Sequence, residues 1–452
     1  MRYLPHTPEE IRQMLDAIGV DSFDALFDAV PPSARFGKRL NIPEGLDEPT
    51  LMQNLQSLAA QNEGAKLTSF LGAGIYAHHI PPAVDQLLLR SEFYTSYTPY
   101  QPEVAQGTLQ AIWEFQTIVS ELFGLPLANA SMYDGSTACA EAVQMARRLT
   151  RRNSIVVSAC VHPQYREVIR TTLGVGTKDA PKVIEVPTDA QGRTDVDALA
   201  AVLDATTAVC VVGYPTFQGG IIDLAPLADK VHKAGALLTS STTEPYALAL
   251  AKAPGSVGVD IATGEGQALA CPPNFGGPGV GLFACRNERQ FLQQLPGRIC
   301  GETVDKNGQR GFVLTLSTRE QHIRRERATS NICTNQGLLA LSLAIRVSML
   351  GKRGFTETAR NCLSLAHYAQ QKICSLRGYE LASSNTFFNE FAIKVTRAPV
   401  AQVLEVAQRH GILPGLALGT LDPKQADRLL IAVTEKHTRA DLDRLCTALD
   451  NA

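Results

Sequence analysis

The sequence predicts an α/β fold with a mostly parallel sheet in a large domain and a smaller C-terminal α/β domain. Between residues 127 and 317, short apolar runs without strict alternation are separated by segments with helical spacing. Strands that are apolar at every position are typical of parallel sheets covered by helices on both faces. After residue 318 a basic stretch and long helical segments replace this pattern. We therefore expect three parts: residues 1–65, 66–318 and 319–452.

Residues 1–65 are predicted to form a helical arm. Thr7-Pro-Glu-Glu10 is a capping box with proline at the first helical position, and apolar residues follow at helical spacing as far as Gly19. Further helical segments are expected near Asp21 and over residues 49–62. An arm of this size is too small to fold alone, so we expect it to pack on the main body or on a partner subunit.

A constrained loop rich in glycine and proline, residues 69–82, leads to a segment with three regularly spaced tyrosines. Prolines on both sides of Gln101 prevent a helix there. Aromatic hydroxyls on a stiff loop suit an active-site wall or a subunit interface, although a tyrosine-rich surface loop explains them equally simply. The tyrosines are Tyr94, Tyr97 and Tyr100. A long amphipathic helix over 104–123, with Trp113 on its apolar face, is expected next.

The core of the large domain is predicted from six strand candidates joined by helices. The strands are expected over residues 154–159, 182–186, 208–212, 236–239, 260–262 and 279–285. The intervening helices are expected over residues 163–172, 196–203 and 224–234. Ligands of such sheets bind beyond the carboxyl ends of the strands.

A polar turn precedes a helix that ends near residue 150. It consists of Asp134, Gly135, Ser136 and Thr137. Free backbone N–H groups and the helix dipole favour an anion at such a helix start, and in this fold class the turn receives a cofactor phosphate. Ordinary N-capping explains the same residues.

The C-terminal domain is predicted to open with a basic stretch, in which Arg319, Arg324, Arg325 and Arg327 lie within nine residues. These side chains could clamp a carboxylate or dock an acidic protein, and a solvated helix is the alternative. Helices are expected over 336–350, 356–376, 400–409 and 438–449, and strands over 388–395 and 428–433.

Residues 260–283 carry a strand, a polar loop and a glycine-rich turn into a second strand. In folds that hold pyridoxal phosphate on a large α/β domain, the lysine that binds the aldehyde lies here. This stretch contains no lysine, and the nearest ones are Lys252 and Lys306. The strand that would place an aspartate on the pyridine nitrogen carries only Ser and Thr over 239–243, with Glu244 late. The chain therefore has the pattern of the fold without its reactive amine.

Composition excludes several classes of protein. The net charge is −2, which gives no support for nucleic-acid binding. No apolar run approaches the roughly 20 residues of a membrane span, and the N-terminus lacks a signal-peptide core, so a cytoplasmic location is expected. The ten cysteines form no Cys-x-x-Cys pair and no zinc spacing, so the sequence predicts buried free thiols and no metal site.

Several long motifs resemble one family, the glycine decarboxylase P-protein of the glycine cleavage system, and specifically the first (alpha) subunit of its split bacterial form. The resemblance covers nearly the whole chain. It is carried by Thr7-Pro-Glu-Glu10, Phe70-Leu-Gly-Ala-Gly-Ile-Tyr76, Tyr97-Thr-Pro-Tyr-Gln-Pro-Glu103, Gln106-Gly-Thr-Leu-Gln110, Met132-Tyr-Asp-Gly-Ser-Thr137, Phe275-Gly-Gly-Pro278, Leu295-Pro-Gly-Arg298, Glu302-Thr-Val304, Arg319-Glu-Gln-His-Ile-Arg324, Thr329-Ser-Asn-Ile-Cys-Thr334 and Phe388-Asn-Glu-Phe391.

The resemblance implies a fold-type-I pyridoxal phosphate enzyme, glycine dehydrogenase (aminomethyl-transferring). Such a complex decarboxylates glycine, releases carbon dioxide and passes the aminomethyl group to the lipoyl arm of the H-protein. In the split form the alpha chain pairs with a beta subunit that carries the pyridoxal phosphate and its lysine, at a position that falls near Gln267 here. This chain is then a structural, site-completing subunit, inactive when isolated.

By the same resemblance, seven residues are candidates to lie near a composite site shared with the beta subunit, and the polar turn at 134–137 is a vestigial phosphate site. The seven are Tyr94, Tyr97, Tyr100, Glu103, Arg319, Asn331 and Thr334. Two alternatives stay open. The chain could be a self-sufficient enzyme that uses an off-pattern lysine such as Lys252, or a pure scaffold with no part in the site.

Overall fold

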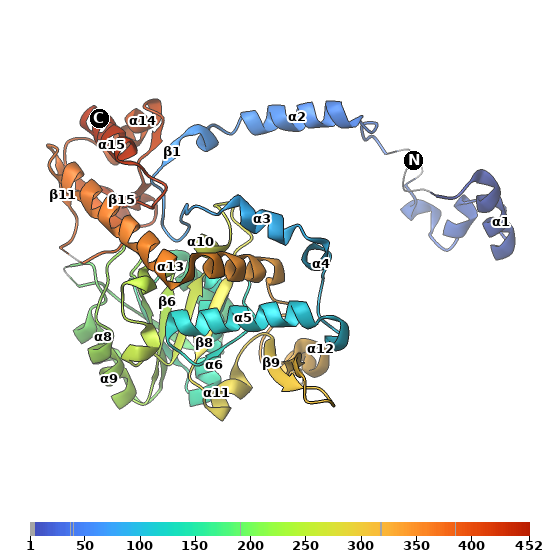
Figure 1. Ribbon diagram of the computed structural model, residues 1–452, viewed down its shortest axis with the longest axis horizontal. Coiled ribbons are helices and arrows are strands. Elements are labelled where there is room, and N and C mark those ends of the chain that lie inside the picture. The colour runs from blue at the N-terminus through green and yellow to red at the C-terminus, as the bar shows by residue number, and fades with distance from the viewer. Residues whose placement is uncertain (1–4, 37, 39, 190, 317–318, 385) are drawn as a thin grey trace. The chain divides into compact units, whose positions relative to one another are not determined.

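The computed structural model describes residues 5–36, 38, 40–189, 191–316, 319–384 and 386–452 (Figure 1). It divides into two compact units, Met1–Glu63 and Gly64–Ala452. The boundary expected between residues 318 and 319 adjoins residues 317–318, which lie outside the described residues. The division of the main body into 66–318 and 319–452 stays a prediction.

The first unit consists of short helices: α1 (Pro8–Ile18), α2 (Glu48–Ala60) and the 3₁₀ turns η1 (Asp24–Phe27) and η2 (Pro32–Ala34). The predicted capping box is present, since the Glu10 amide donates to Thr7 Oγ1 and the Thr7 amide donates to the Glu10 carboxylate. Among the described residues of this unit, Leu15 is the only buried apolar side chain. The unit therefore has almost no core of its own.

The second unit is organised around a seven-stranded sheet in the order β2-β8-β7-β6-β5-β3-β4. Every neighbouring pair from β7 to β4 is parallel, and β8 is antiparallel to both of its neighbours. The mostly parallel sheet predicted from the sequence is therefore confirmed. The strands are β2 (Leu127–Ala128), β3 (Ser154–Ser158), β4 (Lys182–Val186), β5 (Thr207–Gly213), β6 (Leu237–Thr242), β7 (Ile261–Glu265) and β8 (Gly281–Cys285).

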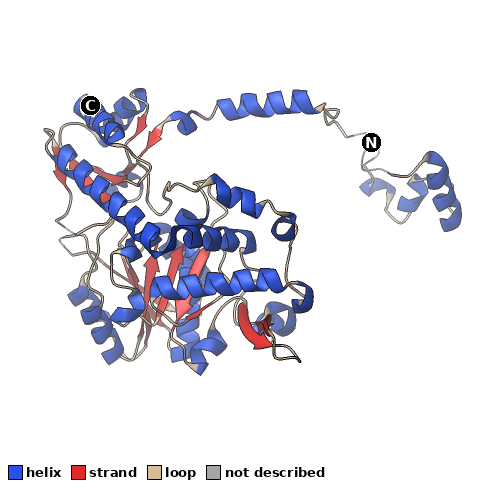
Figure 2. Cartoon of the chain, in the orientation of Figure 1, coloured by secondary structure: helices blue, strands red, loops and turns tan. Residues whose placement is uncertain are grey.

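Helices cover both faces of this sheet (Figure 2). On β3, Val156 packs into one apolar cluster and Val157 into another, which explains why the strands are apolar at successive positions. One cluster includes side chains of α5 (Gln106–Phe123), α8 (Val196–Val202) and α9 (Ala225–Lys233). The other includes side chains of α6 (Gly135–Thr150), α7 (Pro163–Thr172) and α11 (Arg289–Gln294).

The C-terminal part carries a four-stranded antiparallel sheet in the order β11-β12-β15-β14. Its strands are β11 (Tyr379–Leu381), β12 (Glu390–Val395), β14 (Leu416–Ala417) and β15 (Arg428–Ala432). Helices α14 (Val400–Arg409) and α15 (Arg439–Asp450) share its apolar cluster. A further strand pair joins the start of the unit to this region, because β1 (Thr68–Ser69) runs parallel to β13 (Ile412–Leu413).

The two helices expected over 336–350 and 356–376 are present as the two parts of α13 (Gly337–Cys374), which are separated at the non-helical Gly351. A hairpin of β9 (Ile299–Val304) and β10 (Arg310–Thr315) was not predicted, because most of its residues are polar or half-exposed. No helix among the described residues combines the length and the apolar character needed to cross a membrane.

Candidate functional site

Gln267 occupies the position at which the resemblance places the cofactor lysine. It is the first residue of the short helix α10 (Gln267–Ala270), directly beyond the end of β7, and its side chain is buried. Its amide oxygen accepts a hydrogen bond from the Tyr76 N–H (3.1 Å), and its amide nitrogen donates to the carbonyls of Cys271 (2.6 Å) and Tyr76 (3.3 Å). The Gln267 amide is therefore fully engaged with the backbone, and it is not a nucleophile that could replace a lysine.

The polar turn lies at the start of α6, as the sequence predicts, but the chain's own carboxylates accept its hydrogen bonds. Asp134 Oδ1 accepts from the Thr137 N–H (2.7 Å) and from both hydroxyls of the turn. Glu265 Oε2 accepts from the Gly135 N–H (2.9 Å). A Cβ on residue 135 would lie 2.9 Å from the Glu265 nitrogen, so glycine permits this close approach. Two carboxyl groups therefore accept the hydrogen bonds with which a helix start would bind a phosphate.

Glu265 is itself deeply buried at the end of β7. Its Oε1 accepts from the N–H groups of Gln267 (2.9 Å) and Val280 (3.0 Å). Burial raises the pKa of this carboxyl to about 7, against the lowering effect of its backbone donors. Asp134, Ser136, Glu265 and Gln267 line one cavity of about 350 Å³, which includes no lysine or arginine among its lining residues. This cavity therefore lacks the positive charge that is typical of a phosphate site.

The strand end that would support a pyridine nitrogen carries uncharged side chains. Ser240, Ser241 and Thr242 on β6 are all buried. Glu244, the acidic residue that follows β6, is bonded to other side chains. Its carboxylate lies 2.9 Å from His78 Nε2 and accepts from the side chain of Asn389 (3.3 Å). The residues present therefore do not fit covalently bound pyridoxal phosphate at any of the three points that hold its aldehyde, phosphate and ring.

Lys252, the off-pattern alternative, is exposed on the loop between η5 (Pro245–Ala249) and η6 (Pro254–Val257). Lysine catalysts of this type work in dry, enclosed surroundings. An exposed amine lacks such surroundings, which weighs against this alternative.

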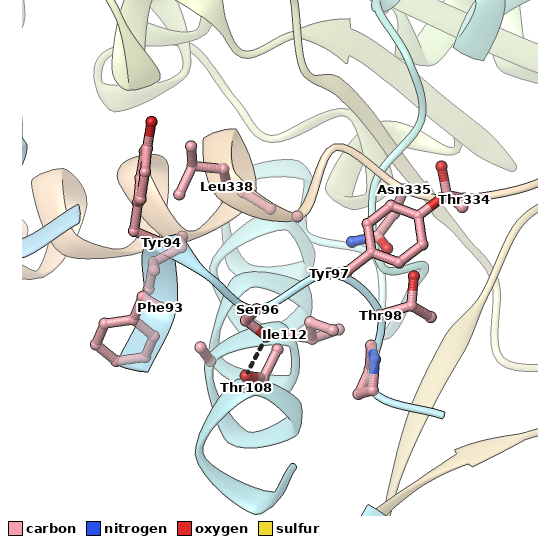
Figure 3. A pocket seen from close by; sticks show the side chains of 15 residues that line it. Phe93, Tyr94, Ser96, Tyr97, Thr98, Thr108, Ile112, Thr334, Asn335 and Leu338 are labelled. Carbon is pink, nitrogen blue, oxygen red and sulfur yellow. Dashed lines mark hydrogen bonds between the residues drawn. The ribbon is translucent and has the colours of Figure 1, made fainter. Parts of the chain in front are cut away.

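The tyrosine-rich segment forms a wall of a second pocket of about 270 Å³ (Figure 3). Tyr94, Tyr97 and Thr334 all line it, so three of the seven composite-site candidates lie together although Thr334 is distant in sequence from the two tyrosines. Tyr94 ends the short helix α4 (Ser91–Tyr94), and Tyr97 lies on the following loop. The exposed fractions of Tyr94 and Tyr97 are 60% and 87%. Both hydroxyls are thus available at the surface.

Three other candidates lie outside the residues that line this pocket. Tyr100 is 70% exposed, and its ring lies under the guanidinium of Arg298, 5.9 Å from the ring centre. Glu103 is exposed on the turn η4 (Pro102–Val104). Asn331 is exposed on the segment that leads to α13.

Arg319 is engaged with backbone carbonyls. Its guanidinium donates to the carbonyls of Leu295, Gly297 (3.3 Å) and Leu316 (3.2 Å). Burial lowers its pKa. The geometry therefore describes a side chain that fastens the segment before α13 to the 295–297 turn, which differs from the carboxylate clamp considered from the sequence. Of the other arginines in the stretch, Arg325 and Arg327 are exposed, and Arg324 is exposed at the end of the four-residue helix α12 (Gln321–Arg324).

Comparison with known proteins identifies the family. The family model described as "Glycine cleavage system P-protein" matches residues 1–449.

The chain belongs to the glycine cleavage system P-protein family.

Relatives of P-protein support a closer assignment. A protein of Sorangium cellulosum named "Probable glycine dehydrogenase (decarboxylating) subunit 1" is 56% identical over 450 residues, which are 99% of each chain. A protein of the same name from Thermomicrobium roseum is 47% identical over 455 residues, which are 100% of each chain. The sequence resemblance to the first subunit of a split P-protein, and hence to a subunit of glycine dehydrogenase, is confirmed.

Solved structures agree with this family. A crystal structure of glycine decarboxylase (P-protein) of the glycine cleavage system, in inhibitor-bound form, superposes with a TM-score of 0.91, 42% identity and complete coverage of both chains. A cysteine desulfurase of Escherichia coli, at 18% identity and a TM-score of 0.62, shares the fold over 90% of this chain and 98% of its own. The predicted α/β fold of the pyridoxal phosphate-dependent type I class is confirmed.

Sequence reasoning missed two residues of the candidate site in this P-protein chain. Asn335 lines the pocket that Tyr94 and Tyr97 share, here called the tyrosine pocket, and donates to the Ala130 carbonyl (2.9 Å). Its position one residue after Thr334 was the available signal in the sequence. Glu265 fills the phosphate turn, and only its place at the end of an apolar strand indicated that it would be buried there.

Proposed function

We propose that this chain completes the active site of a heteromeric glycine decarboxylase without binding pyridoxal phosphate covalently. A partner beta subunit supplies the lysine and the cofactor. The complex decarboxylates glycine in the cytoplasm and transfers the aminomethyl group to the lipoyl arm of the H-protein. The observation that carries this proposal is the buried Gln267 amide, which lies at the lysine position and makes three backbone hydrogen bonds.

The filled phosphate turn supports the same division of labour. Restoring a lysine at position 267 would leave the Asp134 and Glu265 carboxylates on the N–H groups of Thr137 and Gly135. A phosphate approaching them would find these N–H groups already bonded to carboxyl groups and no lysine or arginine among the residues that line the cavity. The cofactor therefore fits a partner subunit better than this one.

Exposed aromatic side chains support a role at a subunit boundary. Tyr94, Tyr97 and Tyr100 expose 60%, 87% and 70% of their surface, and Phe275, next to the glycine-rich turn, exposes 96%. Aromatic residues are enriched at protein interfaces, and large apolar groups that face water mark surfaces for a partner. On this proposal, the tyrosine pocket faces the beta subunit and contributes polar groups to the shared site.

The test is to purify the chain alone and together with its beta subunit and to measure exchange of the glycine carboxyl group with bicarbonate. We expect activity and bound-cofactor absorbance only in the complex. Exchange activity in the isolated chain would refute the proposal. If that activity were lost in Lys252→Ala, the self-sufficient alternative would be correct.

A second experiment separates a site-completing subunit from a pure scaffold. In the assembled complex, Tyr97→Phe removes one hydroxyl without changing the ring. A change in kcat or KM for glycine at unchanged assembly supports a contribution to the site. Full activity of Tyr97→Phe, Tyr94→Phe and Thr334→Val complexes would leave the scaffold role.

A further inference from the structure

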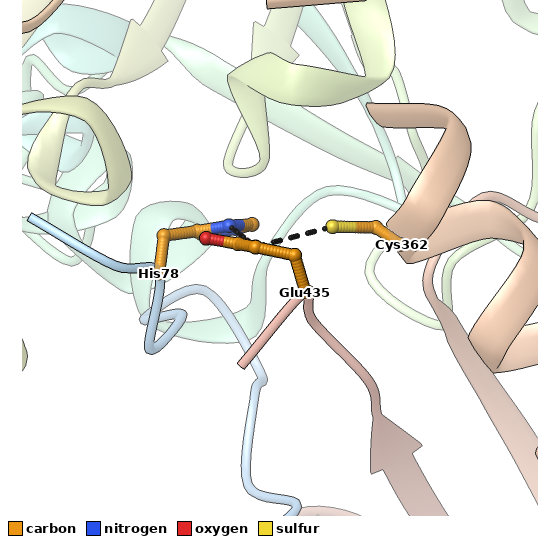
Figure 4. Close-up of side chains that lie close together, drawn as sticks. All are labelled: His78, Cys362 and Glu435. Atoms are coloured by element: carbon orange, nitrogen blue, oxygen red, sulfur yellow. Dashed lines mark hydrogen bonds and ion pairs between the residues drawn. The ribbon is translucent and has the colours of Figure 1, made fainter. Parts of the chain in front are cut away.

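Three side chains from distant parts of the chain form a buried cluster of metal-ligand type (Figure 4). His78 lies on the loop after β1, Cys362 on α13, and Glu435 just beyond the end of β15. One ring nitrogen of His78, Cys362 Sγ and a Glu435 carboxylate oxygen lie within 4.8 Å of one another. The His78 side chain has no exposed surface, and that of Glu435 is 16% exposed. Nothing in the proposed decarboxylase chemistry uses these groups.

The imidazole of His78 lies between two carboxylates. Its Nε2 is 2.9 Å from Glu244 Oε2, and its Nδ1 is 2.7 Å from Glu435 Oε2. When Nε2 carries the proton and donates to Glu244, Nδ1 presents a lone pair to a carboxylate oxygen. A lone pair facing an anion at this distance is repulsive unless a positive centre lies between them. That centre is either a second proton or a metal ion.

Cys362 brings a third group to this pair. Its Sγ lies 3.3 Å from the same Glu435 Oε2 that faces His78. A proton shared between imidazole and carboxylate needs no third donor, whereas a metal ion needs several convergent ones. A sulfur, a nitrogen and an oxygen that converge on one point match the donors that Zn²⁺ accepts.

Surrounding hydrogen bonds hold the donors in place. Glu435 Oε1 accepts from the His79 N–H (2.8 Å), which leaves Oε2 directed at the cluster. Glu244 is held by the Tyr246 N–H (3.1 Å) and the Asn389 side chain (3.3 Å). A carboxylate on the far nitrogen of a histidine is the usual outer partner of a zinc ligand, because it fixes the tautomer and raises ligand basicity.

We propose that His78 Nδ1, Cys362 Sγ and Glu435 Oε2 are three ligands of a Zn²⁺ site. With zinc–ligand distances of about 2.0–2.3 Å, tetrahedral ligand atoms lie roughly 3.3–3.7 Å apart. The Sγ–Oε2 separation of 3.3 Å already fits, and the Nδ1–Oε2 separation of 2.7 Å has to open by less than about 1 Å. The ion would tie the loop after β1, α13 and the segment after β15 together.

Sequence spacing could not reveal such a site. The three ligands are separated by 284 and 73 residues, as their numbers 78, 362 and 435 show, and each is alone in its segment. The usual zinc signals depend on pairs of ligands a few residues apart. Only the fold brings these groups together.

The test uses the full-length chain, made without a histidine tag, stripped with a chelator and titrated with Zn²⁺ and with Co²⁺. We expect about one equivalent of either metal per chain, a higher thermal unfolding midpoint with Zn²⁺, and a near-ultraviolet thiolate-to-Co²⁺ band. Cys362→Ser should abolish the band. Glu244→Gln should weaken metal affinity by about 10–100-fold while the band remains.

Two cysteines provide matched controls. Cys374 lies on the same helix, and Cys333 is exposed, so Cys374→Ser and Cys333→Ser should keep both stoichiometry and band. Circular dichroism checks that each variant is folded. If Cys362→Ser does not fold, Glu435→Gln serves as a second variant that removes a ligand. Binding well below one equivalent in the wild-type chain, or a thiolate band that survives Cys362→Ser, would overturn the proposal and leave a protonated His78 between two carboxylates.

Discussion

Glu390→Gln should stabilise the folded chain at alkaline pH and leave its stability unchanged at acidic pH. Glu390 begins β12, is fully enclosed, and holds the glycine loop that carries Tyr76 and His78. Its Oε1 accepts from the Ala73 N–H (2.6 Å), and its Oε2 contacts the Tyr76 hydroxyl (2.7 Å). A glutamine amide can satisfy both partners, because its oxygen accepts from Ala73 and its nitrogen donates to the Tyr76 oxygen.

The magnitude follows from the pKa of this carboxyl, which burial raises from 4.5 to about 7. A carboxyl with a raised folded-state pKa binds more protons in the folded state. The contribution of Glu390 to the free energy of unfolding is therefore highest below pH 4.5 and falls as the pH rises from 4.5 to about 7. That interval, at about 1.4 kcal/mol for each pH unit, amounts to about 3 kcal/mol. Glutamine carries no charge, so the variant avoids this loss.

The assay is chemical denaturation of wild type and Glu390→Gln at pH 5 and pH 8, followed by circular dichroism. We expect near equality at pH 5 and a higher midpoint for the variant at pH 8. Glu380→Gln, on the exposed side of neighbouring β11, is the control and should show no pH-dependent difference. A variant that is less stable than wild type at pH 8 would show that the ionised carboxylate stabilises the loop, contrary to this reasoning.

Three further outcomes test the site. Gln267→Lys should give no absorbance of bound pyridoxal phosphate in the isolated chain, because Asp134 and Glu265 still occupy the phosphate turn; a new visible band would contradict this. Arg319→Lys should lower the free energy of unfolding by about 1–3 kcal/mol, since a lysine cannot reach the three carbonyls that the guanidinium reaches. Loss of activity at unchanged stability would instead indicate that Arg319 binds a carboxylate. Tyr97→Ala should change the stability of the isolated chain by less than about 0.5 kcal/mol, because the side chain is 87% exposed. The same variant should reduce the exchange activity of the complex at least about tenfold. Leu421→Ala, at another exposed residue, should leave both stability and exchange activity unchanged.

The sequence was sufficient for the architecture because burial leaves a direct record in residue type. Val156 and Val157 are both apolar since each faces a different helix layer, and this pattern identifies a parallel sheet covered on both sides. The hairpin β9–β10 left no such record, because most of its residues are polar or half-exposed and follow no regular pattern of burial.

Residue spacing grouped the tyrosines of the candidate pocket, and the family resemblance added the distant Thr334. Tyr94 and Tyr97 lie a few residues apart, and they line one pocket with Thr334. The role of Arg319 was not readable, because its partners are main-chain carbonyls, which every sequence possesses. The contact between Glu265 and the Gly135 N–H joins segments 130 residues apart, so no local pattern indicates it.

The lack of a core in the first unit, Met1–Glu63, bears on how the chain resists proteases. Leu15 is its one buried apolar side chain among the described residues, while Phe23, Phe27 and Leu55 each expose more than half of their surface. Segments with so few buried contacts open easily and are the first to be cut by proteases. We therefore expect limited proteolysis of the isolated chain to cut first within Met1–Glu63 and to leave Gly64–Ala452 largely intact.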